Sequence, residues 1–130
     1  MINAKAKGTK GERDLTAMFW EAGWAAIRSP GSGAARHPSP DIIAGTPERK
    51  VAIEAKVTKD KVKYLTDEEI EQLREFCEAF NAEPWVAAKF GSAPWLFMTI
   101  EDLEKTEKAY VIREKDARLK GLLFEELIGV

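Results

Sequence analysis

Two carboxylates and an amine lie close together in the first half of the sequence. Pro40-Asp41 is followed thirteen residues later by Glu54-Ala55-Lys56. An aspartate and a glutamate together can hold Mg²⁺, and a lysine beside that ion can orient or deprotonate a water molecule for attack on a phosphate. A large class of metal-dependent nucleases uses the same order of residue types. The chemistry that this spacing predicts is metal-assisted hydrolysis of a phosphodiester.

A predicted β-strand would present Glu54 and Lys56 together. Side chains alternate between the faces of a strand, so the apolar residues of 51–57 would enter a core while Glu54 and Lys56 share the other face. Asp41 opens a second apolar run, 42–44, and can therefore lie at a strand end beside them. Half-exposed strands also alternate charged and apolar residues by chance, and Asp after Pro is common in turns. The spacing alone leaves both interpretations open.

A third carboxylate, Glu12, lies on the apolar side of the first predicted helix. It precedes Leu15 by three residues, and residues three apart share a helix face. A carboxylate that faces a core requires a cation, a metal or water; either Arg13 or a metal site at the sheet edge could meet that need. The ordinary alternative is that Glu12 stabilises the positive end of the helix dipole.

The loop 29–40 has the composition of a phosphate-binding segment. Two glycines flank Ser32, which lets backbone amides approach a phosphate closely. Arg28 directly precedes this loop and Arg36 lies within it. The alternative is a flexible turn, and Gly-Ser-Gly by itself does not decide between the two.

The amino-terminal segment is basic. Such arms grip phosphate backbones without reading base sequence, whereas a merely solvated terminus carries similar charges. Residues 1–63 hold twelve Lys or Arg and seven Asp or Glu, and residues 64–130 hold eight and fifteen. A nucleic acid requires a basic face near the site, so the acidic half should face away from it. The basic candidates of the arm are Lys5, Lys7, Lys10 and Arg13.

The composition is that of one globular domain. A chain of 130 residues, 45% hydrophobic and 32% charged, can bury a single core. No apolar run approaches the ~20 residues that span a membrane, and no apolar segment follows the basic start as a secretory signal requires. One cysteine and one histidine argue against a disulfide framework and a zinc site. We expect an intracellular protein without membrane contact.

Periodicity predicts a mixed sheet flanked by helices. An apolar stripe at helical spacing predicts a first helix over 10–22, ended by Gly23. Thr66 and Glu69 form a capping-box signature for a second helix, with Leu65 and Ile70 as a hydrophobic staple. The α-β-β-β-α-β-β-α order indicates an α/β fold with a mixed central sheet of about five strands. The predicted strands cover 24–28, 41–44, 51–57, 84–89 and 95–99, and the last helix covers 114–128.

Four motifs together resemble the archaeal Holliday junction resolvase family, part of the restriction-endonuclease-like superfamily. The resemblance covers most of the chain, because the helix near 72–80 and the strand near 95–99 follow in the expected order. On this basis we expect one nuclease domain over 1–130, with residues 1–9 as a flexible basic arm. The motifs are Lys10-Gly11-Glu12-Arg13, Arg28-Ser29-Pro30-Gly31-Ser32-Gly33, Pro40-Asp41 and Glu54-Ala55-Lys56.

The resemblance implies a homodimeric endonuclease that resolves four-way DNA (Holliday) junctions in recombination and repair. It implies Mg²⁺ as the cofactor, with Mn²⁺ as a substitute, and a cytoplasmic, nucleoid-associated location. Lys56 would orient or deprotonate the attacking water, with its pKa lowered beside the ion. The implied catalytic residues are Glu12, Ser32, Asp41, Glu54 and Lys56, the metal ligands are Glu12, Asp41, Glu54 and Ala55, and the DNA-binding residues are Lys5, Lys7, Lys10, Arg13, Arg28, Ser32 and Arg36.

Two other functions stay open at this point. One is a nuclease of the same superfamily that acts on duplex or flapped DNA, which the motifs cannot distinguish from a resolvase. The other is a non-catalytic DNA-binding module, which is disfavoured because no catalytic residue is missing. Other recombination proteins are conceivable partners. The dimer is expected to form through an apolar face that the core does not need, drawn from Leu73, Phe76, Cys77 and Phe80 or from Leu119, Leu122, Leu123, Phe124 and Leu127.

Overall fold

A five-stranded mixed sheet forms the centre of the molecule, seen in a computed structural model that describes residues 4–30 and 36–130. Its strand order is β1-β2-β3-β5-β6. β3 and β5 run parallel, and the other neighbouring strands run antiparallel. The predicted mixed sheet of about five strands is confirmed. The strands are β1 Ala25–Arg28, β2 Ile42–Gly45, β3 Lys50–Thr58, β5 Glu83–Phe90 and β6 Leu96–Met98.

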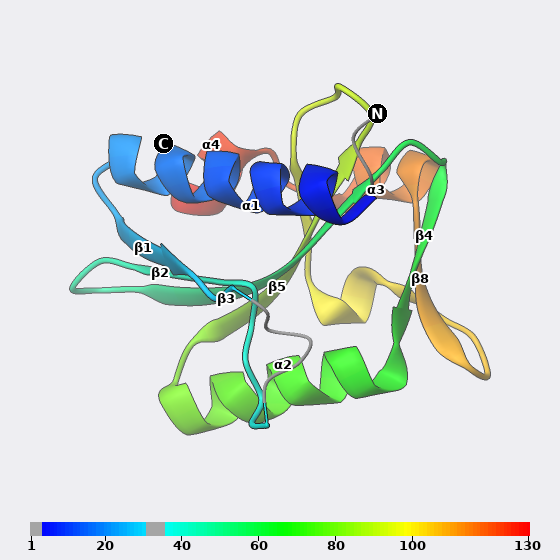
Figure 1. The fold of residues 1–130 in the computed structure, drawn as a ribbon, viewed down its shortest axis with the longest axis horizontal. Helices are drawn as coiled ribbons and strands as arrows, with labels where there is room; N and C mark the ends of the chain where they lie inside the picture. Colours follow the sequence, from blue (N-terminus) through cyan, green and yellow to red (C-terminus); the bar gives the residue numbers. More distant parts are fainter. Residues whose placement is uncertain (1–3, 31–35) are drawn as a thin grey trace.

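Helices cover both faces of this sheet (Figure 1). α1 (Ala4–Glu21) and α4 (Phe124–Ile128) lie over one face, and α2 (Asp67–Phe80) lies over the other. β3 contributes to both cores: Ile53 packs in the cluster with α1, whereas Ala52 packs in the cluster with α2. Because side chains alternate along a strand, Glu54 and Lys56 point to the same side as Ala52, toward α2.

The start of α2 follows the sequence signals closely. Thr66 Oγ1 accepts a hydrogen bond from Glu69 N at 3.0 Å, and Glu69 Oε1 accepts one from Thr66 N at 2.9 Å, which closes the predicted capping box. Leu65 and Ile70, the predicted staple, are both fully buried in the same core cluster. The helix ends at Asn81, whose φ of 59° is in the left-handed region.

A second, three-stranded sheet was not predicted. It has the order β4-β8-β7 and includes exposed side chains such as that of Tyr64. β7 consists of two charged residues, and β4 and β8 are five residues long, which is too short for alternation to separate them from a loop. The strands are β4 Val62–Thr66, β7 Glu104–Lys105 and β8 Ala109–Arg113, and a 3₁₀ turn, η2 Ile100–Asp102, precedes β7.

Two helix predictions differ from the structure. α1 begins at Ala4, so residues 4–9, expected to lie in a flexible arm, form the first turns of a helix. The single helix predicted over 114–128 is wrong, because α3 (Glu114–Lys120) ends before α4 begins. A Cβ on Gly121 would lie 2.5 Å from the Ala117 carbonyl oxygen. Leu122 then forms paired 2.8 Å backbone hydrogen bonds with Phe97, which hold the chain extended between the two helices. Within the described ranges, no helix is long and apolar enough to cross a bilayer.

Candidate active site

Asp41 lies where β2 and β3 separate. The last antiparallel pair is Ile42 opposite Ile53, and Asp41 N donates to the Ile53 carbonyl at 3.0 Å. Beyond this pair the side chain of Asp41 replaces the partner strand, because its Oδ2 accepts from Ala55 N at 2.8 Å. Asp41 is buried. The predicted position of Asp41 at a strand end is therefore what fixes its carboxylate beside β3.

The charge of Asp41 acts on two other carboxylates, Glu12 on α1 and Glu54 on β3. Burial and the charge of Asp41 raise the pKa of Glu12 to about 7. The same two causes, burial first, raise the pKa of Glu54 to about 9. The charge of Asp41 therefore acts on both of the other predicted acids, which places the three carboxylates in one electrostatically coupled region. Such a cluster retains protons until a cation compensates its charge.

Glu12 has a cationic partner, and it is Arg28. Arg28 Nη1 lies 3.5 Å from Glu12 Oε1, and the two side chains are only 16% and 18% exposed. Arg13, one of the alternatives suggested by the sequence, is exposed. Arg28 is mostly buried and compensates the charge of Glu12, and its predicted contact with DNA stays a prediction.

Lys56 is held between two carboxylates. Its Nζ lies 3.9 Å from Glu54 Oε2 and 2.5 Å from Glu69 Oε2 on α2. Burial alone would lower the pKa of Lys56, but the hydrogen bond to Glu69 and the charges of Glu69, Glu54 and Asp41 raise it. The lowered pKa expected from the sequence concerned Lys56 beside a bound ion, and it stays a prediction. The protein's own groups favour the charged ammonium, which suits orienting a water or a phosphate oxygen.

Glu69 is the residue of this group that no sequence motif assigned to the site. Its role in the capping box was readable from the Thr66–Glu69 spacing. Its contact with Lys56 was not readable, because that contact depends on how β4 returns the chain so that α2 begins beside β3. β4 was itself not predicted, so no signal in the sequence placed these two residues together.

The basic residues of α1 divide into different environments. Lys5 is exposed, whereas Lys10 Nζ pairs with Asp14 at 2.7 Å. A hydrogen bond and the like charge of Lys59 lower the pKa of Lys7, which places these two amines side by side. Arg36 is exposed. Ser32, predicted for catalysis and DNA contact, lies outside the described residues.

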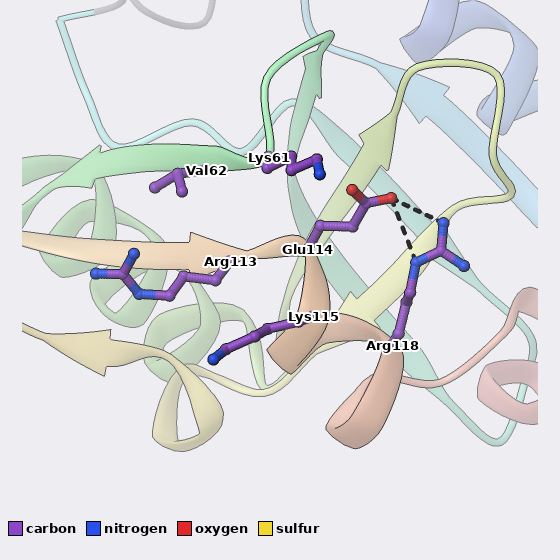
Figure 2. A pocket seen from close by; sticks show the side chains of 6 residues that line it. All are labelled: Lys61, Val62, Arg113, Glu114, Lys115 and Arg118. Carbon is purple, nitrogen blue, oxygen red and sulfur yellow. Dashed lines mark hydrogen bonds and ion pairs between the residues drawn. The ribbon is translucent and has the colours of Figure 1, made fainter.

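A basic recess of about 530 Å³ lies away from these acids, between β4, β8 and α3 (Figure 2). Arg118 pairs with Glu114 at 2.8 Å, and Arg113 pairs with Glu104 at 3.0 Å. The acidic second half of the chain therefore contributes a basic surface of its own, which the charge count did not predict. The recess contains none of the catalytic candidates and is lined by Lys61, Val62, Arg113, Glu114, Lys115 and Arg118.

The carboxylates do not converge on one point as a ready-made metal cage. Among residues 4–30 and 36–130, no group of three or more His, Cys, Asp or Glu has an arrangement that could hold a metal ion. Asp41 instead raises the pKa of both Glu12 and Glu54 through its charge. The arrangement provides two carboxylates at the strand opening, a third from α1, and an ammonium beside them.

Comparisons with known proteins agree on one family. The model of the family "Archaeal holliday junction resolvase (hjc)" matches residues 3–130. The chain is 42% identical over 132 residues to the crossover junction endodeoxyribonuclease Hjc of Archaeoglobus fulgidus, covering 96% of this chain and 97% of the relative. It is 35% identical over 125 residues to the protein of the same name from Methanocaldococcus jannaschii, covering 95% and 87%.

A solved structure shows the same likeness in three dimensions. Archaeoglobus fulgidus Hjc, described as a Holliday junction resolvase from an archaeal hyperthermophile, superimposes with a TM-score of 0.87. The sequence identity in this comparison is 44%, and the match covers 94% of this chain and all of the other.

Proposed function

The chain belongs to the archaeal Holliday junction resolvase family, and we propose that it resolves four-way DNA junctions by hydrolysing phosphodiesters in paired strands. Three predictions from the sequence are confirmed by the named relatives and the solved structure. They are the family, the restriction-endonuclease-like fold and the activity class, an endodeoxyribonuclease. The observation that carries the chemistry is the position of Asp41 at the opening between β2 and β3, where its charge acts on two further carboxylates.

A divalent metal fits this set of donors. Carboxylate oxygens are the ligands that hard divalent cations prefer, and the raised pKa values of Glu12 and Glu54 mark negative charge that a cation would compensate. Asp41 and Glu54 would hold the ion, with the carbonyl of Ala55 and with Glu12 directly or through water. When bound, Mg²⁺ or Mn²⁺ would polarise the scissile phosphate and lower the pKa of a bound water.

The protein's own residues orient the reaction. The backbone N–H of Ala55 fixes one oxygen of Asp41, so this carboxylate cannot rotate freely. Arg28 holds Glu12 at the edge of the cluster. The ammonium of Lys56 lies on the same strand face as Glu54, where it can donate to the attacking water or to a phosphate oxygen.

Lys7 and Lys59 support a path for DNA beside the site. Gly11 allows close packing of α1 on β3, because a Cβ there would lie 2.7 Å from Val57 Cγ2. This packing brings Lys7, about one helical turn before Gly11, beside Lys59, three residues after Lys56. An anion such as a backbone phosphate would reduce the repulsion between these two adjacent positive charges. The further DNA contacts proposed are Lys5, Lys10, Arg13, Arg28, Ser32 and Arg36.

A homodimer suits the proposed reaction. A four-way junction has two strands to cut at symmetric positions, and a two-fold dimer presents two sites in matching orientation. Phe80 on α2 is 44% exposed and packs against Phe76, with ring centroids 5.3 Å apart and the rings tilted at 41°. We propose that residues 1–130 form one nuclease domain and that this part of α2 lies at the interface.

Cleavage of a synthetic junction tests the function. Incubation with Mg²⁺ is expected to give paired, symmetric nicks in the junction, while a linear duplex of the same sequences stays intact. Asp41→Asn is the matched control, because it removes a ligand charge and no phosphate-binding cation. It should abolish cleavage and leave junction binding nearly unchanged in a gel-shift titration. Equal cutting of the linear duplex would instead indicate a nuclease without junction selectivity.

A further inference from the structure

Glu69 lies outside the four sequence motifs, yet its carboxylate contacts the proposed catalytic lysine. Lys56 Nζ is 2.5 Å from Glu69 Oε2 and 3.9 Å from Glu54 Oε2. The side chains of Lys56 and Glu69 are 20% and 30% exposed. A charge-assisted hydrogen bond in such a partly desolvated place is shorter and stronger than a neutral one. The lysine is therefore held by a residue from a different element.

The same carboxylate also closes the capping box of α2. Glu69 Oε1 accepts from Thr66 N at 2.9 Å, while Oε2 contacts Lys56. Ile70, the next residue, is fully buried and anchors this first turn of the helix in the core. The two contacts use the two oxygens of one planar group. The start of α2 thereby sets the position of the Lys56 ammonium relative to β3.

We propose that Glu69 is a positioning residue, which holds the ammonium of Lys56 beside the metal-binding carboxylates instead of on them. The inference rests on the proposed nuclease function of this site. Without Glu69, the ammonium would be left with Glu54, which is already 3.9 Å away. Pairing there would neutralise a carboxylate that the metal requires. With Glu69 present, the ammonium is bonded to a carboxylate of a different element at 2.5 Å, so that Glu54 is left for the metal.

Glu69→Gln separates the two contacts of Glu69. A glutamine in a capping box still accepts from the N-cap N–H, but it no longer pairs with Lys56 as an anion. The matched control is Thr66→Ala, which removes the cap hydroxyl that accepts from Glu69 N and keeps the Glu69 carboxylate. We expect Glu69→Gln to slow single-turnover cleavage of a four-way junction roughly 10- to 100-fold with unchanged junction affinity. Thr66→Ala should lower the melting temperature without slowing cleavage.

The NMR signal of the Lys56 ammonium gives a readout that does not depend on nuclease activity. In metal-free protein at low temperature, a firmly bonded ammonium exchanges its protons slowly and gives a ¹H–¹⁵N signal, which Lys56→Arg identifies by its loss. The signal should persist in Thr66→Ala and disappear in Glu69→Gln. The proposal is overturned if Glu69→Gln cleaves at the wild-type rate, if both variants slow cleavage equally, or if the signal survives Glu69→Gln. A wild-type protein that cuts no junction would overturn the proposed function, while the signal would still test the contact.

Discussion

Lys56 is surrounded by carboxylates, which restricts what it can do. Its pKa is raised by Glu69, Glu54 and Asp41 against the opposing effect of burial, so it acts more readily as a cation than as a base. Lys56→Ala should lower the single-turnover cleavage rate by ~10²–10³-fold, the usual cost of removing one electrostatic donor. Raising the Mg²⁺ concentration should not restore it, because Lys56 is not a metal ligand.

Lys89→Ala is the matched control for this measurement. Lys89 lies on the adjacent strand β5, opposite Val57, and its Nζ donates to the Ala93 carbonyl at 2.7 Å. Its removal should leave the cleavage rate near that of the wild type. Full rescue of Lys56→Ala by excess Mg²⁺ would mean that Lys56 only helps to assemble the metal site.

Glu54 couples the active site to stability through pH. Its pKa is raised to about 9 in the folded protein, so the folded state binds this proton more tightly than the unfolded chain does. The stability that this proton contributes is present below the unfolded pKa of ~4.3 and is lost as pH rises toward 9. Glu54→Gln removes the titration. In the presence of a chelator it should be more stable than wild type at pH 8 by roughly 4 kcal/mol.

Urea denaturation at pH 4.5 and at pH 8 measures this difference. The two proteins should have similar unfolding free energies at pH 4.5, where the wild-type carboxyl is protonated in the folded state and about 40% protonated in the unfolded chain. Glu12, whose pKa is raised to about 7, should leave a smaller pH dependence in the variant. A constant difference between the two proteins at both pH values would show that Glu54 is not protonated in the folded state.

At the scale of elements, α1 carries the proposed DNA contact next to the site. Junction affinity should fall steeply with salt, and the variant Lys5→Ala/Lys7→Ala/Lys10→Ala should flatten the slope of log affinity against log salt. The expected change is about 0.9 for each phosphate that the variant no longer neutralises. Lys10 is already paired with Asp14, so Lys5 and Lys7 should account for most of the change.

A charge-matched control separates a local effect from net charge. Lys108, Lys115 and Lys120 are exposed on the side of the molecule formed by β8 and α3. Their joint replacement by alanine removes the same number of charges, and it should leave the slope close to that of the wild type. Equal slopes for the wild type and the α1 variant would rule out DNA binding by the α1 lysines.

Elements that are specified by residues close together in the sequence were predicted, and those that depend on distant contacts were not. The β3 strand and the capping box of α2 were predicted because alternation and cap chemistry act over a few residues. The break between α3 and α4 was missed because the pairing of Leu122 with Phe97 joins distant segments. The acidic residues of the site were predicted from their residue types and their order along the sequence. Their partners Arg28 and Glu69 were not, since each contact crosses between elements.

For the whole molecule, the structure reduces the apolar surface available for a dimer. Four residues offered as interface candidates, Leu73, Cys77, Phe124 and Leu127, are buried in the protein's own cores. The candidates that remain well exposed are Phe80 on α2, Leu119 on α3 and Leu123 at the start of α4, at 44%, 83% and 43%.

Phe80 is the better interface candidate, because it is an aromatic anchor backed by Phe76 and by the amine of Lys50, 4.6 Å from its ring centroid. Aromatic anchors carry much of the energy of interfaces, so Phe80→Ser should raise the dimer dissociation constant roughly 100-fold. Leu119→Ser, a change at a more exposed but isolated side chain, should leave the dimer intact. Sedimentation at micromolar concentration distinguishes these outcomes. Dissociation by Leu119→Ser alone would move the interface to the carboxy-terminal helices. A monomeric wild type, with cleavage linear in protein concentration, would remove the two-fold arrangement on which paired cutting depends.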